Sequence, residues 1–324
     1  MSDQDLKSCH ILVTSTSFGI NDPTMKTKLE EQVGQVTYNT LGRPYTSTEL
    51  QELLRDVDGY IAGLDEIDRV VIQSAPKLRV ISRYGVGVDN VDLEAAKDNN
   101  VVVTNTPGAN TASVAELTVG LILVLVRSIY DAVISTKVGE WPRCRGVSLE
   151  GKTIGLIGFG KIGQEVARKL AGFDCQILAF DIAPDFDTAR QYHVELVEFD
   201  ELLKKSDILS LHCSLVSETG NLLNQKSFNK MKDGVYLINT ARGELIDEDA
   251  LLEALNRGKI HGAAVDVFSQ QPPDPDNLLL QHPKVITTPH MGSHTDLAMN
   301  KMGWWAVRDC LAVLRGDEPE YRII

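Results

Sequence analysis

The chain has 324 residues, enough for two globular domains, because one domain typically holds about 100 to 200 residues. Apolar residues make up 43% and charged residues 24% of the chain, a composition that is ordinary for a globular protein and excludes a largely disordered one. The net charge of −13 argues against nucleic acid and against an anionic membrane as partners, since both require a basic surface.

The cysteines and the apolar segments predict a cytoplasmic protein. The five cysteines are an odd number without CxxC spacing, so we expect no metal site and a reducing environment. The N-terminal sequence MSDQDLKSCH lacks the basic start and apolar stretch of a signal peptide. The longest apolar run, from Leu117 to Val126, has about half of the length that a bilayer span requires and predicts a buried helix.

Short runs rich in valine and isoleucine alternate with helix-like stretches along the first part of the chain. This pattern is typical of an α/β protein in which helices cover both faces of a parallel sheet. Five strands are predicted, at His10–Thr14, Val33–Tyr38, Gly59–Ala62, Arg79–Ser82 and Val101–Thr104.

The sequence TNTPG (104–108) interrupts this alternation and predicts a hinge, followed by a long helical stretch from Ala112 to Ser135. A second α/β series then begins, so we expect two doubly wound domains. Its predicted strands are Lys152–Ile157, Gln176–Phe180, Ile208–His212, Val235–Asn239, Gly262–Val265 and Lys284–Thr287.

The sequence GFGKIG (158–163) lies directly between the first strand of the second series and a helical stretch. A GxGxxG in this context predicts a dinucleotide site: Gly158 permits a tight turn, Gly160 lets the backbone approach a pyrophosphate, and Gly163 lets the helix pack on the strand. Asp181 ends the next strand, where a carboxylate can bind the ribose hydroxyls and disfavours a 2′-phosphate. NAD is therefore the predicted cofactor, although three glycines can also form a plain strand-to-helix turn.

A second GxG, in SRYGVGVDN (82–90), also follows a strand but has no third glycine. Successive backbone N–H groups in such a loop can bind a small anion such as a substrate carboxylate. A plain turn explains the spacing equally well.

Polar residues follow three strands of the second series at the edge where open α/β sheets bind ligands. Arg242 can bind a carboxylate with its planar fork, and His290 can exchange a proton with a hydroxyl group as hydride moves. Each also has a simpler explanation, because Arg242 could pair with Glu244 or Asp247 and His290 could cap a turn.

Several longer segments, taken together, resemble one known family along nearly the whole chain. They are SRYGVGVDNVD (82–92), TNTPGANTASVAEL (104–117), GFGKIG (158–163), LINTARGELIDEDAL (237–251), AAVDVF (263–268) and TTPHMGSHT (287–295). The chain resembles the D-isomer-specific 2-hydroxyacid dehydrogenases, and within them the short phosphoglycerate dehydrogenase-like branch without a regulatory C-terminal domain. The implied activity is NAD-dependent hydride transfer between nicotinamide and a small anionic D-2-hydroxy or 2-oxo acid, such as D-3-phosphoglycerate.

The resemblance implies roles for individual residues. Arg242 would orient the substrate carboxyl and carbonyl groups, and His290 would be the acid/base. The residues implied in substrate binding are Arg83, which matches an arginine that helps to hold a phosphate, and Val86 and Gly87, through their N–H groups. The residues implied in cofactor binding are Gly158, Gly160, Lys161, Ile162, Gly163, Asp181, Cys213, Thr240, Asp266 at the nicotinamide carboxamide, and Gly292.

Gln271 departs from the family pattern, because this position usually holds a glutamate that orients the histidine and stabilises its charged form. Glutamine can orient His290 but cannot neutralise it, so we expect a lower or shifted pH profile. Asp274 and Asp276 are the nearest other carboxylates and could compensate.

Three other features of the resemblance bear on the substrate. The family's formate dehydrogenases use glutamine at the position of Gln271, which makes formate an alternative substrate. A second phosphate-binding arginine of the phosphoglycerate branch would fall near Gly63 and is absent. Arg143 and Arg145 match basic residues that this branch presents from a neighbouring subunit, although a solvated turn explains them as well.

The resemblance also implies the domain organisation. The substrate domain would comprise residues 1–106 and 294–324, and the NAD-binding domain residues 107–293, with the active site between them. The helix at 112–135 would join a homodimer. A regulatory protein that binds NAD(H) and has weak activity is the alternative from another functional class, supported by Gln271.

Overall fold

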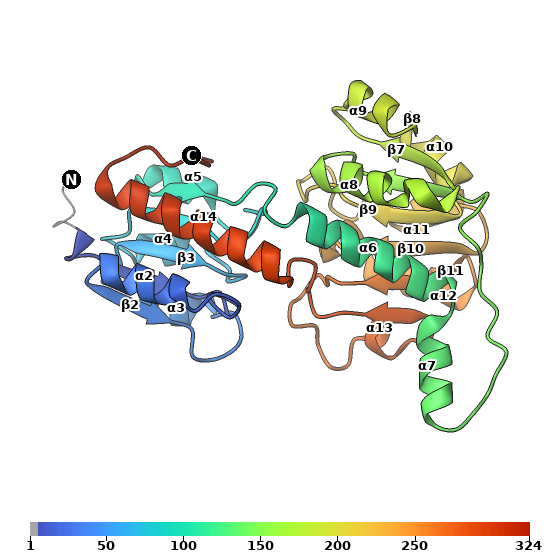
Figure 1. The fold of residues 1–324 in the computed structure, drawn as a ribbon, viewed down its shortest axis with the longest axis horizontal. Coiled ribbons are helices and arrows are strands. Elements are labelled where there is room, and N and C mark those ends of the chain that lie inside the picture. The colour runs from blue at the N-terminus through green and yellow to red at the C-terminus, as the bar shows by residue number, and fades with distance from the viewer. Residues whose placement is uncertain (1–5) are drawn as a thin grey trace. The chain divides into compact units, whose positions relative to one another are not determined.

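The structure is a computed structural model that describes residues 6–324, so the first half of the N-terminal decapeptide lies outside the described residues. The chain forms two compact units, each built on its own sheet (Figure 1). Unit 1 comprises the described part of Met1–Asn110 together with His294–Ile324, and unit 2 comprises Thr111–Ser293. All strand pairs are parallel, which confirms the predicted α/β class.

Unit 1 is a five-stranded sheet in the order β2-β1-β3-β4-β5, with helices on both faces. One face packs on α2 and α14 through residues such as Ile11 and Ile61, and the other packs on α3, α4 and α5 through residues such as Leu12 and Tyr60. The strands are β1 His10–Val13, β2 Gln35–Tyr38, β3 Gly59–Ala62, β4 Val80–Arg83 and β5 Val102–Thr104. The helices are α2 Thr24–Gln32, α3 Ser47–Leu53, α4 Arg69–Gln73, α5 Leu93–Asp98 and α14 Asp296–Arg315.

Unit 2 is a seven-stranded sheet in the order β12-β11-β10-β9-β6-β7-β8. Its two faces also form separate apolar layers, one with α6 and α8 and the other with α10, α11 and α12. The strands are β6 Thr153–Ile157, β7 Gln176–Phe180, β8 Val194–Leu196, β9 Ile208–Leu211, β10 Val235–Asn239, β11 Ile260–Val265 and β12 Val285–Thr287. The α-helices are α6 Thr111–Val126, α7 Ile129–Lys137, α8 Lys161–Leu170, α9 Phe186–Gln191, α10 Phe199–Lys205, α11 Gln225–Lys230, α12 Glu248–Asn256 and α13 Leu278–Gln281.

The predicted strands are present with boundaries that agree within two residues, but two other expectations need correction. β8 was not predicted, because a three-residue edge strand carries too short an apolar pattern to be recognised. The helix expected from Ala112 to Ser135 is two helices, since Ser128 adopts a left-handed conformation with φ of +49°. α6 is half-buried in the core, whereas α7 has no buried residue.

No single described helix is long and apolar enough to cross a membrane. The broken pair of α6 and α7 reaches the required length and composition only when joined, and it is bent by 66°.

Candidate functional site

The sequence GFGKIG forms the turn between β6 and α8, and its glycines are required by close contacts. Gly158 has φ of +96°, and a Cβ there would lie 2.5 Å from the backbone nitrogen of Cys213. A Cβ on Gly163 would lie 2.3 Å from the carbonyl oxygen of Gly158, so a side chain would separate the helix from the strand. A Cβ on Gly160 would meet nothing within 4 Å. Open space at this glycine, at the start of a ten-residue helix, suits a pyrophosphate that approaches the backbone.

Asp181 follows β7 and is bonded to the same turn. Its Oδ2 accepts a hydrogen bond from the N–H of Phe159 at 2.6 Å, and its Oδ1 accepts one from the N–H of Ala183 at 2.9 Å. The carboxylate is thereby fixed beside the GFGKIG loop. Lys161 and Ile162 form the first turn of α8, as the predicted cofactor site requires.

Cys213 follows β9, on the other side of β6 from β7, and borders the same turn. Burial raises the pKa of its thiol to about 11, and the negative charge of Asp181 acts in the same direction. The thiol is therefore neutral at physiological pH and offers a half-buried apolar surface rather than a reactive thiolate.

Arg242 lies in a turn after β10 that Asn239 holds from both sides. The side chain of Asn239 donates to the carbonyl oxygen of Arg242 at 2.7 Å and accepts from the N–H of Ala241 at 3.0 Å. Thr240 is bonded to Thr118 of α6 through their hydroxyl groups at 2.8 Å. The turn is thus anchored to β10 and to α6, which fixes the point from which the Arg242 side chain projects.

His290 lies in the loop that follows β12 and has φ of +50°, a rare conformation for a residue with a side chain. Its backbone N–H donates to the carbonyl oxygens of Asp266 at 2.8 Å and Thr288 at 3.0 Å. These bonds fix the backbone of His290, from which the imidazole projects.

Asp266, at the end of β11, organises the same loop. Its Oδ1 accepts from the Thr288 hydroxyl at 2.5 Å and from the Met291 N–H at 2.9 Å, and its Oδ2 accepts from the Gly292 N–H at 2.9 Å. The carboxylate is 1% exposed. A buried carboxylate with several donors is a strong anchor, so Asp266 holds the residues on both sides of His290.

Gln271 contacts the imidazole directly. Its Nε2 donates to the carbonyl oxygen of Phe268 at 3.1 Å, so its Oε1 is the atom that lies 2.5 Å from Nδ1 of His290. Because this oxygen can only accept, Nδ1 must carry the proton, and a neutral His290 has its lone pair on Nε2. Asp274 accepts from the N–H of Asp276 within the exposed loop, and neither carboxylate is bonded to His290.

In unit 1, the loop of Gly85, Val86 and Gly87 has all three of its carbonyl oxygens hydrogen-bonded. They accept from the Thr106 N–H at 3.0 Å, the Asn105 side chain at 2.7 Å and Nε of Arg83 at 3.1 Å, respectively. Within residues 6–324 the N–H groups of Val86 and Gly87 donate to no acceptor. The loop therefore presents two adjacent donors, as an anion site requires.

The predicted site residues fall into two groups, one in each unit. In unit 2, Asp266, Gln271, His290 and Gly292 form one hydrogen-bonded cluster. Sequence reasoning did not anticipate that Asp266 holds the histidine loop or that Asn105 anchors Val86, although Asn105 lies in the TNTPG segment that it singled out. Arg83 was expected to contact substrate, but its side chain is 3% exposed and is bonded to backbone carbonyls inside unit 1.

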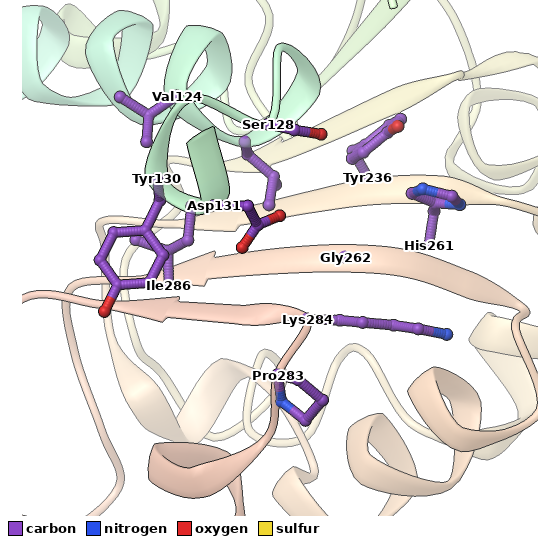
Figure 2. A pocket seen from close by; sticks show the side chains of 11 residues that line it. Val124, Ser128, Tyr130, Asp131, Tyr236, His261, Gly262, Pro283, Lys284 and Ile286 are labelled. Atoms are coloured by element: carbon purple, nitrogen blue, oxygen red, sulfur yellow. The ribbon is translucent and has the colours of Figure 1, made fainter. Parts of the chain in front are cut away.

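Unit 2 also has a small cavity of about 100 Å³ between α7 and the last strands of the sheet (Figure 2). Its lining includes Tyr130 and Asp131 of α7 together with Tyr236, His261 and Lys284. These last three residues are near the amino ends of β10, β11 and β12, whereas the candidate catalytic residues follow the carboxyl ends. The cavity is therefore at the opposite edge of the sheet from the candidate site.

Comparison with known proteins finds one family. Residues 119–292 match the family described as D-isomer specific 2-hydroxyacid dehydrogenase, NAD binding domain. The glyoxylate reductase of Thermofilum pendens is 42% identical over 299 residues, which cover 90% of this chain and 88% of the relative.

Two further similar proteins are named for substrates other than glyoxylate. The D-3-phosphoglycerate dehydrogenase of Methanocaldococcus jannaschii is 42% identical over 297 residues, which cover 90% of this chain but only 56% of that longer relative. The crystal structure of an NAD-dependent formate dehydrogenase from Staphylococcus aureus in complex with NAD has a TM-score of 0.85 and 31% identity, and covers 97% of this chain and 99% of that chain.

Proposed function

This chain belongs to the D-isomer-specific 2-hydroxyacid dehydrogenase family, and from that premise we propose that it interconverts a small anionic D-2-hydroxy acid and the corresponding 2-oxo acid. It is an NAD-dependent oxidoreductase, and the glycine turn, Asp181 and the start of α8 are the residues that would hold the cofactor. Bound nicotinamide supplies or accepts the hydride. The acids to be tested include glyoxylate, hydroxypyruvate and 3-phosphohydroxypyruvate, the oxidation product of D-3-phosphoglycerate.

The observation that carries the mechanism is the contact between Gln271 and Nδ1 of His290. It favours the neutral tautomer with its lone pair on Nε2, and this nitrogen can take the hydroxyl proton during oxidation. In the opposite direction His290 must first bind a proton at Nε2 and then give it to the carbonyl oxygen of the 2-oxo acid. Gln271 orients the ring in both directions but supplies no charge to stabilise the protonated form.

Two groups of donors are proposed to bind the substrate. The planar guanidinium of Arg242 would bind the carboxylate and orient the carbonyl, as bidentate arginines do. The N–H groups of Val86 and Gly87 would provide further donors for the carboxylate. Asp266 keeps the loop of His290 in place and is also proposed to bind the nicotinamide carboxamide.

The test is NADH oxidation by the purified protein with glyoxylate, hydroxypyruvate, 3-phosphohydroxypyruvate and pyruvate. We expect turnover with at least one of these acids, and its loss in His290→Ala. His282→Ala is the matched control, because His282 lies in the same unit before β12, and within residues 6–324 its Nδ1 accepts only from the nearby Lys284 N–H. Tight NADH binding without turnover of any acid would contradict the proposal and favour a regulatory NAD(H)-binding protein.

Formate is a second candidate substrate, because Gln271 occupies the position beside His290. Oxidation of formate releases no hydroxyl proton, so a histidine that is not stabilised in its charged form would suffice. Reduction of NAD by formate, without reduction of any 2-oxo acid by NADH, would favour this alternative.

A homodimer is proposed from the surface of α7. No residue of this nine-residue helix is buried, and Tyr130 and Ile134 are 53% and 46% exposed. Trp141, just beyond it, is 89% exposed. Such a short helix is marginal by itself, so we propose that a second copy of the chain covers it in a symmetric contact. Ile134→Asp should then shift the mass measured by light scattering from dimer to monomer.

A cytoplasmic location remains a proposal as well. It is supported by the five cysteines, none of which forms a disulfide within residues 6–324.

A further inference from the structure

We infer that Arg83 positions the 85–87 loop rather than binding a substrate phosphate, and that the enzyme therefore selects unphosphorylated 2-oxo acids. This inference rests on the proposed function and narrows its substrate class. The evidence comes from the hydrogen bonds of Arg83, from the buried charges around it and from the absence of a side chain at Gly63.

The guanidinium of Arg83 is directed into unit 1. Its Nη1 donates to the carbonyl oxygen of Ala62 at 2.7 Å and makes a second, shorter contact with that of Gly63. Its Nε donates to the carbonyl oxygen of Gly87 at 3.1 Å. One planar group thus joins the end of β3 to the proposed carboxylate loop, and an arginine that is 3% exposed has little surface to offer to a phosphate.

The bond to Gly87 completes the arrangement of that loop. Thr106 and Asn105 hold the carbonyl oxygens of Gly85 and Val86, whose peptide groups carry the N–H groups of Val86 and Gly87, and Arg83 holds the next carbonyl oxygen, that of Gly87. Loss of the Arg83 bond would let the peptide group between Gly87 and Val88 rotate and would loosen the backbone directly after the two donors. Arg83 would then act on any substrate carboxylate through the loop, whatever the rest of the substrate contains.

A buried carboxylate lies near the same end of the sheet. Asp65 is fully buried and accepts from the N–H of Tyr45 at 2.7 Å, from the Tyr60 hydroxyl at 3.0 Å and from the Thr14 hydroxyl. Burial raises the pKa of the Tyr60 hydroxyl well above its usual value, and the charges of Asp65 and Arg83 also act on this hydroxyl. Asp65 therefore places a negative charge in the same buried region as the positive charge of Arg83, with Tyr60 near both.

The structure leaves few cations for a phosphate at this edge of unit 1. Gly63 offers no side chain, and a Cβ there would lie 3.1 Å from Cα of Ser15, so the backbone is tightly packed. Arg43, in the loop after β2, is bound by both oxygens of Glu49 at 2.7 and 2.9 Å. A phosphate with a charge near −2 needs several charge-assisted contacts, and the protein itself carries a net charge of −13.

The primary test compares kcat/KM for hydroxypyruvate and for 3-phosphohydroxypyruvate, with NADH and the unmodified protein. We expect hydroxypyruvate to be favoured by about 10- to 100-fold, the factor that one missing charge-assisted hydrogen bond typically contributes. A preference for the phosphorylated acid would overturn the inference while supporting the proposed function. Failure to reduce any 2-oxo acid would instead refute the proposed function, and this inference with it.

The second test is Arg83→Gln, which removes the positive charge and replaces the planar guanidinium with a shorter, neutral amide. We expect KM for both acids to rise by a common factor of about 10, while the NADH dissociation constant measured by fluorescence stays unchanged. Arg83→Lys, which can keep one bond to a carbonyl, should recover part of the loss. Arg43→Ala is the matched control and should alter neither KM.

The ratio between the two acids distinguishes the two roles of Arg83. A positioning residue leaves this ratio unchanged, whereas a phosphate ligand would lose activity only toward 3-phosphohydroxypyruvate. A selective loss of that kind in Arg83→Gln or Arg83→Lys would refute the inference. If Arg83→Gln does not fold, the ratio for the unmodified protein and for Arg83→Lys still decides the question.

Discussion

Replacing Gln271 by glutamate should convert the neutral partner of His290 into a charged one. In the present structure Oε1 of Gln271 lies 2.5 Å from Nδ1 of His290. The substitution Gln271→Glu would place a carboxylate oxygen at this position with almost no change in side-chain size. It would also remove the Nε2 donor that now bonds to the carbonyl oxygen of Phe268.

The expected magnitude follows from the charge. A carboxylate in direct contact typically raises the pKa of a histidine by about 1 to 3 units, and each unit corresponds to about 1.4 kcal/mol. A raised pKa keeps His290 protonated at higher pH. Reduction of a 2-oxo acid, which needs the protonated form, should therefore persist to a pH about 1 to 3 units higher, whereas oxidation of the hydroxy acid at neutral pH should slow.

The assay is kcat/KM for reduction of the best 2-oxo acid between pH 5 and 10, in Gln271→Glu and in the unmodified protein. Gln281→Glu is the control, because it adds the same charge at an exposed position in α13. Identical pH profiles for Gln271→Glu and the unmodified protein would refute the reasoning, since Gln271 would then not govern the protonation of His290.

Three further outcomes follow from contacts in unit 2. Asp181→Ala should weaken NADH binding and reduce discrimination against NADPH, by about tenfold each, as measured by fluorescence titration with both nucleotides. Gly163→Ala should destabilise unit 2 by about 1 to 3 kcal/mol, because its Cβ would lie 2.3 Å from the carbonyl oxygen of Gly158; an unchanged denaturant midpoint would contradict this close packing. Burial lowers the pKa of His212 from 6.5 to about 3, so the unfolded chain binds its proton more readily and stability should fall as pH drops below 6.5. His212→Asn should reduce that pH dependence in thermal unfolding.

Much of the fold could be predicted from the sequence, because the relevant signals are local. The alternation of β-branched runs with helical stretches located the strands of both sheets except β8. GFGKIG and Asp181 indicated the dinucleotide site in advance, since a tight turn, a close approach and a helix start each demand glycine at a fixed position. The candidate catalytic residues were identified by their place after strands, a rule that needs only the strand boundaries.

The tertiary structure decided what each side chain contacts. Gln271 and His290 are 19 residues apart, and the direction of the glutamine amide depends on the carbonyl oxygen of Phe268. The inward path of Arg83 depends on carbonyl oxygens at the end of a neighbouring strand. The break between α6 and α7 could not be predicted, because neither glycine nor proline marks it in the sequence. Ser128 adopts its left-handed conformation inside a continuous helical pattern. The sequence by itself therefore determined the strands, the cofactor loop and the residue types of the site. Hydrogen bonding between distant segments determined the tautomer of the histidine and the inward direction of the arginine, because neither property is encoded by local spacing.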